Sequence, residues 1–237
     1  MRKFELVILL LFALPAVTYA QDEEKKNENG QVKQVPKEEP RINLKGLISQ
    51  SMSFLVIEHA IRMGDPQTRN ELRGPFFSDW FNSVASIKGW DDGDGFVPNW
   101  VGHPMQGSVS AFIFANNHKP SQNIKFGLNK EYWRAKRAQF IYAVIYSVMF
   151  EIGPLSESSL GNLGFKQGKN TYIDHVVTPI AGILWSIGED AMYQYLILPV
   201  SRWNPKVGNV VLVILNLTRS TANALSFQYP WRGTLPR

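Results

Sequence analysis

The chain has no cysteine among its 237 residues. Disulfide bonds therefore cannot stabilise it, and no thiolate is available to bind a metal ion. The HExxH zinc pattern, the phosphate-binding glycine loop and the GxSxG nucleophile motif are also missing. The sequence by itself therefore assigns neither a cofactor nor a metal.

A strong excess of charge of one sign is missing as well. The chain carries 25 Lys+Arg and 20 Asp+Glu, which gives a formal net charge of +5. No basic cluster with interleaved aromatic residues occurs, so we expect no nucleic-acid partner. The mild positive charge is compatible with weak attraction to anionic lipid. The partners we expect are membrane lipid or another envelope protein.

The N-terminal region predicts export. Arg2 and Lys3 precede an apolar run from Leu6 to Leu14, and Ala20 ends a small-residue cleavage site. This pattern is typical of a signal peptide over residues 1–20, and the run is short for a stable anchor. Residues 21–45 contain six acidic and six basic residues but no aromatic residue, which predicts a disordered linker. Residues 46–237 then form one domain.

The domain has helical rather than strand periodicity. Six segments are expected to be helices: 46–63, 75–90, 98–117, 130–152, 172–200 and 208–225. The fold class predicted is all-α, a compact bundle of about six helices with a very apolar core. The apolar runs 139–150 and 175–188 are shorter than the roughly 20 residues needed to span a bilayer. We therefore expect a membrane-associated bundle, with a fully embedded bundle as the alternative.

The acidic stretch at residues 91–107 resembles a calcium loop only superficially. An EF-hand starting at Asp92 would place Phe96 at position five and His103 at position twelve, where oxygen ligands are needed. The aspartates therefore predict a turn. After them, Gly107, Ala111 and Ala115 place small residues along one helix face, where another helix can approach closely.

Histidine 103 begins a polar line on the same helix, with Gln106, Ser110 and Asn117. One interpretation is a core histidine whose hydrogen bonds are satisfied. The other is a ligand or an acid–base group, because histidine titrates near neutral pH.

Three carboxylates lie in apolar surroundings: Glu151, Asp174 and Glu189. Asp174, Thr178 and Glu189 share one helix face, but the two carboxylates are about 22 Å apart along an unbroken helix. They therefore cannot pair directly with each other. Candidate catalytic residues are His103, Glu151, Asp174 and Glu189, and candidate binding residues are Asn99, Gln106 and Thr178. Whether the four candidates for catalysis converge is left open by the spacing.

Three segments, "NWVGHPMQG" (99–107), "FEIGPLSESS" (150–159) and "DHVVTPIAGILWSIGED" (174–190), together resemble a known family. It is the uncharacterised bacterial envelope family catalogued as domain of unknown function 3943. The resemblance covers roughly residues 99–195. Because the family has no assigned activity, it supports the choice of residues but implies no reaction.

The function expected is that of an exported, membrane-associated protein of a bacterial cell envelope, located in the periplasm or at a membrane, with a structural or binding role. The alternative is an envelope enzyme, a hydrolase or transferase, that acts on a lipid or cell-wall substrate through a His/carboxylate site. A small-molecule carrier is a third hypothesis, which requires an open cavity between helices.

Overall fold

The computed structural model describes residues 41–64, 69, 75–90, 95–160 and 171–233. The helices are α2 (Leu44–Arg62), α4 (Phe76–Ala85), α5 (His103–Asn117), α6 (Lys130–Ile152), α7 (Glu157–Leu160), α8 (Ile173–Met192), α9 (Leu198–Trp203), α10 (Pro205–Leu215) and α11 (Leu217–Leu225). In these residues the only β pairing is an isolated bridge between Ile42 and His118. The predicted all-α bundle is confirmed. The expected signal peptide and the linker up to residue 40 lie outside the described residues, as do Asp91, Asp92 and Asp94.

The helical unit begins at Arg41, a few residues before the expected boundary at residue 46. Lys119 N–H donates to the Arg41 carbonyl, and Asn43 N–H donates to the Asn117 carbonyl. The Asn43 side chain also caps α2 by accepting from Gly46 N–H. These bonds attach the chain before α2 to the end of α5.

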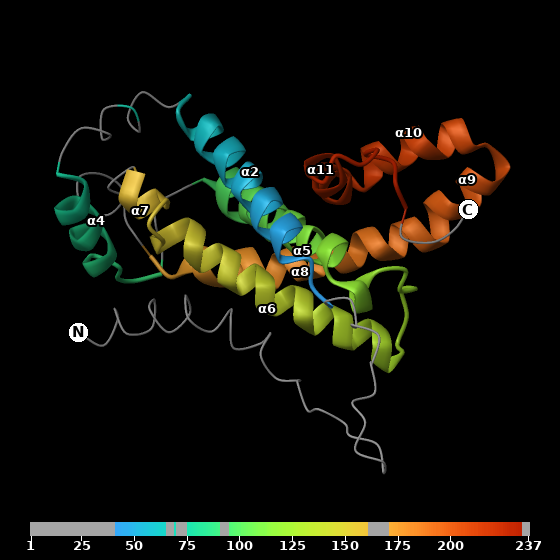
Figure 1. Cartoon of the computed structure of the whole chain (residues 1–237), viewed down its shortest axis with the longest axis horizontal. Coiled ribbons are helices and arrows are strands. Elements are labelled where there is room, and N and C mark those ends of the chain that lie inside the picture. Colours follow the sequence, from blue (N-terminus) through green and yellow to red (C-terminus); the bar gives the residue numbers. More distant parts are fainter. Residues whose placement is uncertain (1–40, 65–68, 70–74, 91–94, 161–170, 234–237) are drawn as a thin grey trace, which may run out of the picture. The chain divides into compact units, whose positions relative to one another are not determined.

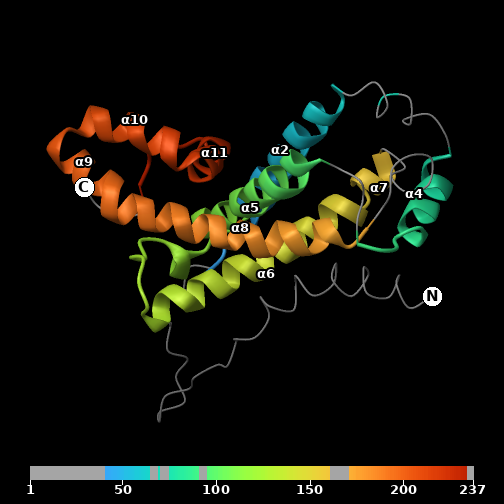
Figure 2. The same ribbon diagram turned by 180° about the vertical axis from the view of Figure 1, so that it is seen from behind.

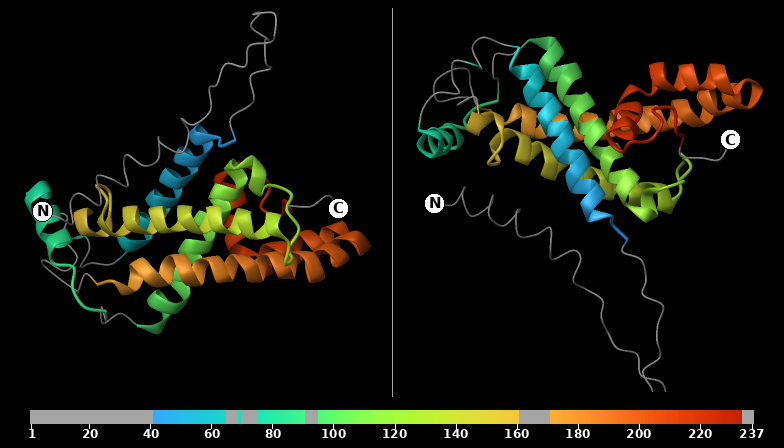
Figure 3. Two further views of the ribbon diagram at one scale, coloured as in Figure 1. Left: turned by 90° about the horizontal axis from the view of Figure 1, so that it is seen from below. Right: turned by 45° about the horizontal axis from the view of Figure 1, so that its top comes forward.

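The long helices α6 and α8 run side by side in opposite directions, and α2 and α5 cross them (Figures 1 and 3). Beyond α8 the chain continues into α9, and α10 turns back beside it (Figure 2). Because α6 and α8 are antiparallel, the end of α6 lies beside the start of α8. The start of α6 lies beside the end of α8. Polar residues from both helices meet at each of these ends.

Helices α5 and α8 cross closely at Gly107 and Gly182. A Cβ atom placed on Gly182 would lie 2.6 Å from the Gly107 Cα, and one on Gly107 would overlap the Thr178 carbonyl. Only hydrogen fits at both positions, as the small-residue stripe beginning at Gly107 predicts. This crossing brings His103, one turn before Gly107, against the first turns of α8.

A π-helical turn precedes a proline at two places. The turns are Pro98–Gly102, before Pro104, and Tyr193–Ile197, before Pro199. A proline ring clashes with the carbonyl four residues earlier and donates no hydrogen bond, so a widened turn relieves both problems. The predicted helices 98–117 and 172–200 are therefore not regular along their length.

The prediction of one continuous helix over 208–225 is wrong. Asn216 leaves the helical conformation, with φ −116° and ψ 57°, and separates α10 from α11. The Glu189 carboxylate accepts from the backbone N–H groups of Thr218 and Arg219, each at 3.0 Å. Asn216 also donates to the Glu189 carbonyl at 3.0 Å. The new helix start is stable because a carboxylate from another helix satisfies its free N–H groups.

The interior is more polar than expected. One apolar cluster joins α2, α5, α6 and α11 around Phe112, Ile113 and Tyr146. The buried residues also include many polar ones, among them Ser108, Ser147 and Thr178, which are 0% exposed. Large apolar side chains lie on the outside instead, at every fourth position of α2 (Ile48, Met52, Val56) and α8 (Val176, Ile180, Leu184).

Among the described residues, one segment is long and apolar enough, by length and composition, to cross a membrane. It is Lys130–Leu160, and 44% of its most apolar window is buried inside the protein. The core helix of a soluble protein has the same length and composition, so this segment alone does not establish membrane contact.

Candidate functional site

His103 lies at the first turn of α5 with both ring nitrogens in polar contact. Nε2 is 3.1 Å from Asp174 Oδ1 on α8. Nδ1 is 3.1 Å from Thr178 Oγ1, one turn further along α8, and 3.3 Å from Gln106 Oε1 on its own helix. The ring is therefore held from both sides. Its orientation is set by α8 as well as by its own helix.

Glu151 joins this pair from the last turn of α6. Glu151 is 2% exposed, and its Oε1 atom has no hydrogen-bond partner among the described residues. One ligand atom each from His103, Glu151 and Asp174 lie within 4.8 Å of one another. Three of the four predicted residues thus converge, and each comes from a different helix. We call His103, Glu151 and Asp174 the His–carboxylate cluster.

The electrostatics of this cluster disfavour negative charge on Glu151. Burial raises its pKa well above the ordinary value, and the nearby carboxylates of Glu157 and Asp174 raise it further. Glu157 is itself paired with Arg62 at 2.7 Å, so that cation is already engaged. Glu151 therefore retains a proton unless a cation enters the cluster.

Glu58 of α2 extends the polar interior behind the cluster, and sequence reasoning missed it. Its carboxylate Oε2 accepts from the Tyr146 hydroxyl at 2.6 Å. Burial raises the pKa of Glu58 to about 8, although hydrogen bonds from Tyr146 and Gln106 act in the opposite direction. A carboxylate within the apolar segment 46–63 was the available signal in the sequence.

His175 lies next to Asp174 in the chain but is kept neutral. Burial lowers its pKa to about 4, and the nearby His103 contributes. It does not supply one of the three converging ligand atoms. Burial therefore disfavours the positive charge of His175, as it disfavours the negative charge of Glu151.

The predicted binding residues lie close to the cluster in two cases of three. Gln106 and Thr178 both contact the His103 ring. Asn99 is buried in the π-turn directly before α5.

Glu189 does not belong to the cluster. It lies at the opposite end of α8, is 1% exposed, and caps α11 while also accepting from the Trp185 indole N–H. Its buried carboxylate is explained by this structural role.

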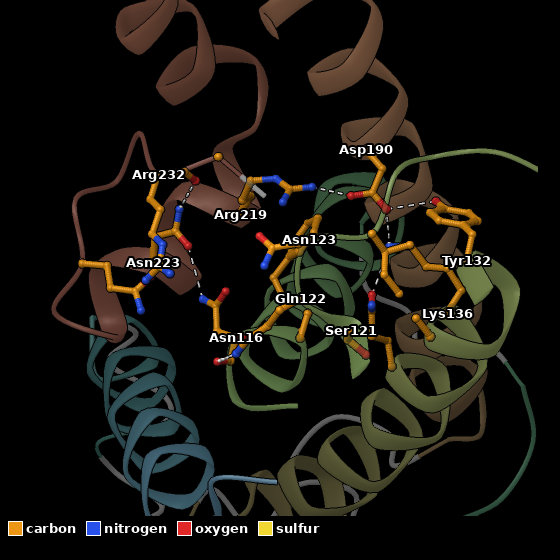
Figure 4. A pocket seen from close by; sticks show the side chains of 17 residues that line it. Asn116, Ser121, Gln122, Asn123, Tyr132, Lys136, Asp190, Arg219, Asn223 and Arg232 are labelled. Carbon is orange, nitrogen blue, oxygen red and sulfur yellow. Dashed lines mark hydrogen bonds and ion pairs between the residues drawn. The ribbon is translucent and has the colours of Figure 1, made fainter. Parts of the chain in front are cut away.

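A second polar cluster, also missed from the sequence, occupies that opposite end. Asp190 accepts from Lys136 Nζ at 2.7 Å, from the Tyr132 hydroxyl at 2.9 Å and from the Arg219 guanidinium. Figure 4 shows the three donors reaching the same carboxylate. The two cations hold the pKa of Asp190 below its usual range despite burial, which by itself would raise it. Charged residues within the segments 130–152 and 208–225 were the signal for it.

Comparison with known proteins adds no assignment to this geometry. No family model matches the chain, and neither a curated protein nor a solved structure matches it. The resemblance to the envelope family of unknown function therefore stays a prediction from the sequence.

Proposed function

We propose that this chain is a metal-binding protein of the bacterial cell envelope. The observation that carries the proposal is the convergence of one imidazole and two carboxylates from three helices, with one ligand atom of each within 4.8 Å of the others. Imidazole nitrogen and carboxylate oxygen are suitable ligands for divalent first-row metal ions, including zinc and manganese. A buried acceptor without a donor is costly, and a bound cation removes that cost.

The hydrogen bonds around His103 support this function. When Nδ1–H donates to Gln106 Oε1, Nε2 carries the lone pair and lies 3.1 Å from Asp174 Oδ1. A ligating histidine ordinarily has its second nitrogen held in this way. Zinc lies about 2.0–2.2 Å from such ligands, which places tetrahedral ligand atoms about 3.4 Å apart. The three donor atoms, which lie within 4.8 Å of one another, must therefore approach by up to about 1.4 Å to bind it.

The envelope location in this proposal is supported by the N-terminal signal pattern and by the exposed apolar positions on α2 and α8. Polar residues inside and apolar residues outside suit a protein that contacts lipid. Net attraction to anionic lipid adds to this contact.

Zinc titration by isothermal calorimetry tests the proposal. The purified protein is expected to bind one Zn²⁺ per chain, and His103→Gln and Glu151→Gln are each expected to weaken binding by roughly tenfold or more. Because Glu151 holds a proton when the site is empty, binding at neutral pH releases protons. The observed enthalpy should therefore depend on the ionisation enthalpy of the buffer.

The matched control is Glu189→Gln, which removes a buried carboxylate from the same helix as Asp174. It should leave zinc affinity unchanged, with circular dichroism used to confirm helix content. Equal affinity of Glu151→Gln and the wild type would contradict the proposal. So would equal losses in Glu151→Gln and Glu189→Gln, which would indicate a global effect on the fold.

The envelope enzyme is a second candidate, favoured by the 3.1 Å approach of Asp174 to His103 Nε2. The His103 ring lies between the Thr178 hydroxyl and the Asp174 carboxylate, which is the arrangement of a hydroxyl–base–acid triad. Thr178 is 0% exposed, however, so no substrate reaches its hydroxyl. Only an acid–base role for His103 therefore stays open. The enzyme candidate predicts that the protein releases fatty acid from phospholipid vesicles or fragments from cell-wall polymer. It also predicts that His103→Gln abolishes this release.

A further inference from the structure

A cavity lies at the end of the bundle opposite the His–carboxylate cluster. Its volume is about 90 Å³, and α5, α6, α8, α11 and the segment after α11 contribute to its lining. The charged residues in the lining are Lys136, Asp190, Arg219 and Arg232. Three of these four side chains are cationic.

The cavity keeps a positive charge when its surroundings are counted. Asp190 offsets one of the three cations. Glu189 lies behind the lining and offsets a second, although its carboxylate is already bonded by two backbone N–H groups of α11. The positive charge that is left over belongs to Arg232, which is exposed, so the excess charge lies on the solvent-facing side of the cavity.

Arg219, which lines this cavity, has an unused donor. The residue is 2% exposed, and its Nε–H has no acceptor among the described residues. The guanidinium is held in place by Asp190 and by the Phe112 ring, whose centroid is 4.3 Å from the guanidinium carbon. A fixed guanidinium with a free N–H is a preorganised donor for an oxyanion.

The mouth of the cavity carries donors that reach solvent. Arg232 and Asn123 line it and are both exposed. Asn223 donates to the Pro230 carbonyl at 3.1 Å and to the Arg232 carbonyl at 2.9 Å, and so attaches the C-terminal segment to α11. Figure 4 shows the bond to Arg232. The position of Arg232 at the mouth is thus set by a buried side chain.

We propose that this cavity binds one small oxyanion, the phosphate or carboxylate group of a ligand, between Arg219 and Arg232. The volume holds several water molecules or one such group. Pockets that enclose drug-sized ligands run from about 300 Å³ upward, so a nucleotide does not fit inside. The oxyanion comes from a free metabolite or from a lipid headgroup, because both present the same chemistry.

Calorimetric titration with inorganic phosphate and with glycerol 3-phosphate tests the proposal on the full chain. The wild type is expected to bind both, more weakly as salt is added. Arg219→Gln should lower affinity roughly tenfold or more, since a buried charged hydrogen bond is lost. Arg232→Gln, an exposed change that does not threaten folding, should lower it about two- to fivefold.

The matched control is Arg137→Gln, which removes an exposed cation next to Lys136 but outside the cavity. It should leave affinity unchanged. Absence of phosphate and glycerol 3-phosphate binding by the wild type would overturn the proposal, as would equal losses in Arg232→Gln and Arg137→Gln.

The source of the oxyanion is separated in a second arm with vesicles. If the ligand is a headgroup, Arg232→Gln should reduce sedimentation with phosphatidylglycerol vesicles but not with phosphatidylcholine vesicles. If the ligand is free, glycerol 3-phosphate binds while Arg232→Gln leaves sedimentation unchanged. Both results support an oxyanion site. Zinc binding at the other end of the bundle is measured separately, so either proposal can fail alone.

Discussion

Glu58 shows how one buried carboxylate makes stability depend on pH. Its proton is retained in the folded protein up to about pH 8, whereas the ordinary value for this group is 4.5. Over that window the folded state binds more protons than the unfolded chain, so stability falls as pH rises. The pKa values of three histidines, His59, His118 and His175, are lowered from the ordinary value of 6.5. These residues therefore do not account for a change in stability above pH 7.

Glu58→Gln is therefore expected to remove part of the pH dependence. Between pH 7 and pH 8 the wild type should lose about 1 kcal/mol of stability through this residue, and the variant should not. Urea unfolding at several pH values measures the difference. A variant with the same slope as the wild type between pH 7 and pH 8 would show that Glu58 is ionised in the folded protein.

At the scale of the elements, the α5–α8 crossing decides where His103 lies. The two helices approach at Gly107 and Gly182 so closely that a methyl group would meet backbone atoms. His103 and Asp174 come into contact only because this crossing is tight. The stripe of small residues on α5 was legible from spacing, but spacing along one helix does not show that Gly182 of α8 is its partner.

Gly182→Ala should destabilise the protein by about 1–3 kcal/mol, because the new methyl group overpacks the crossing. Gly188→Ala is the control on the same helix, where a Cβ meets nothing within 4 Å. It should be neutral or stabilise by up to about 1 kcal/mol, as alanine favours helix. Thermal unfolding of both variants measures this contrast, and similar effects from the two would refute the close packing.

For the whole molecule, the distribution of apolar side chains is the informative property. The interior contains two polar clusters, and serine, threonine and amide side chains are buried as well. The outer faces of α2 and α8 present apolar side chains at four-residue spacing. In the proposed envelope protein, these faces contact lipid.

Replacing Ile180 and Leu184 together by Asn is expected to weaken sedimentation with phospholipid vesicles roughly tenfold, since two apolar side chains leave the lipid contact. Leu128→Asn is the control, because Leu128 is 92% exposed but lies outside both helices. If Leu128→Asn weakens sedimentation as much as the double variant, the effect is not specific to the α8 face.

Local pattern determined the helices. The segments at 46–63 and 130–152 match α2 and α6 closely because apolar spacing and caps are properties of neighbouring residues. The segment at 75–90 contains α4 but extends five residues beyond its end at Ala85. Pattern also selected His103, Glu151 and Asp174 as polar residues that need partners.

Tertiary structure decided which partners they have. The antiparallel arrangement of α6 and α8 brings Glu151 beside Asp174 and sends Glu189 to the far end, where it caps a helix start that no local signal predicts. Sequence spacing measures distance along one helix, whereas a site depends on distances between helices, and those are set by the packing of the whole bundle.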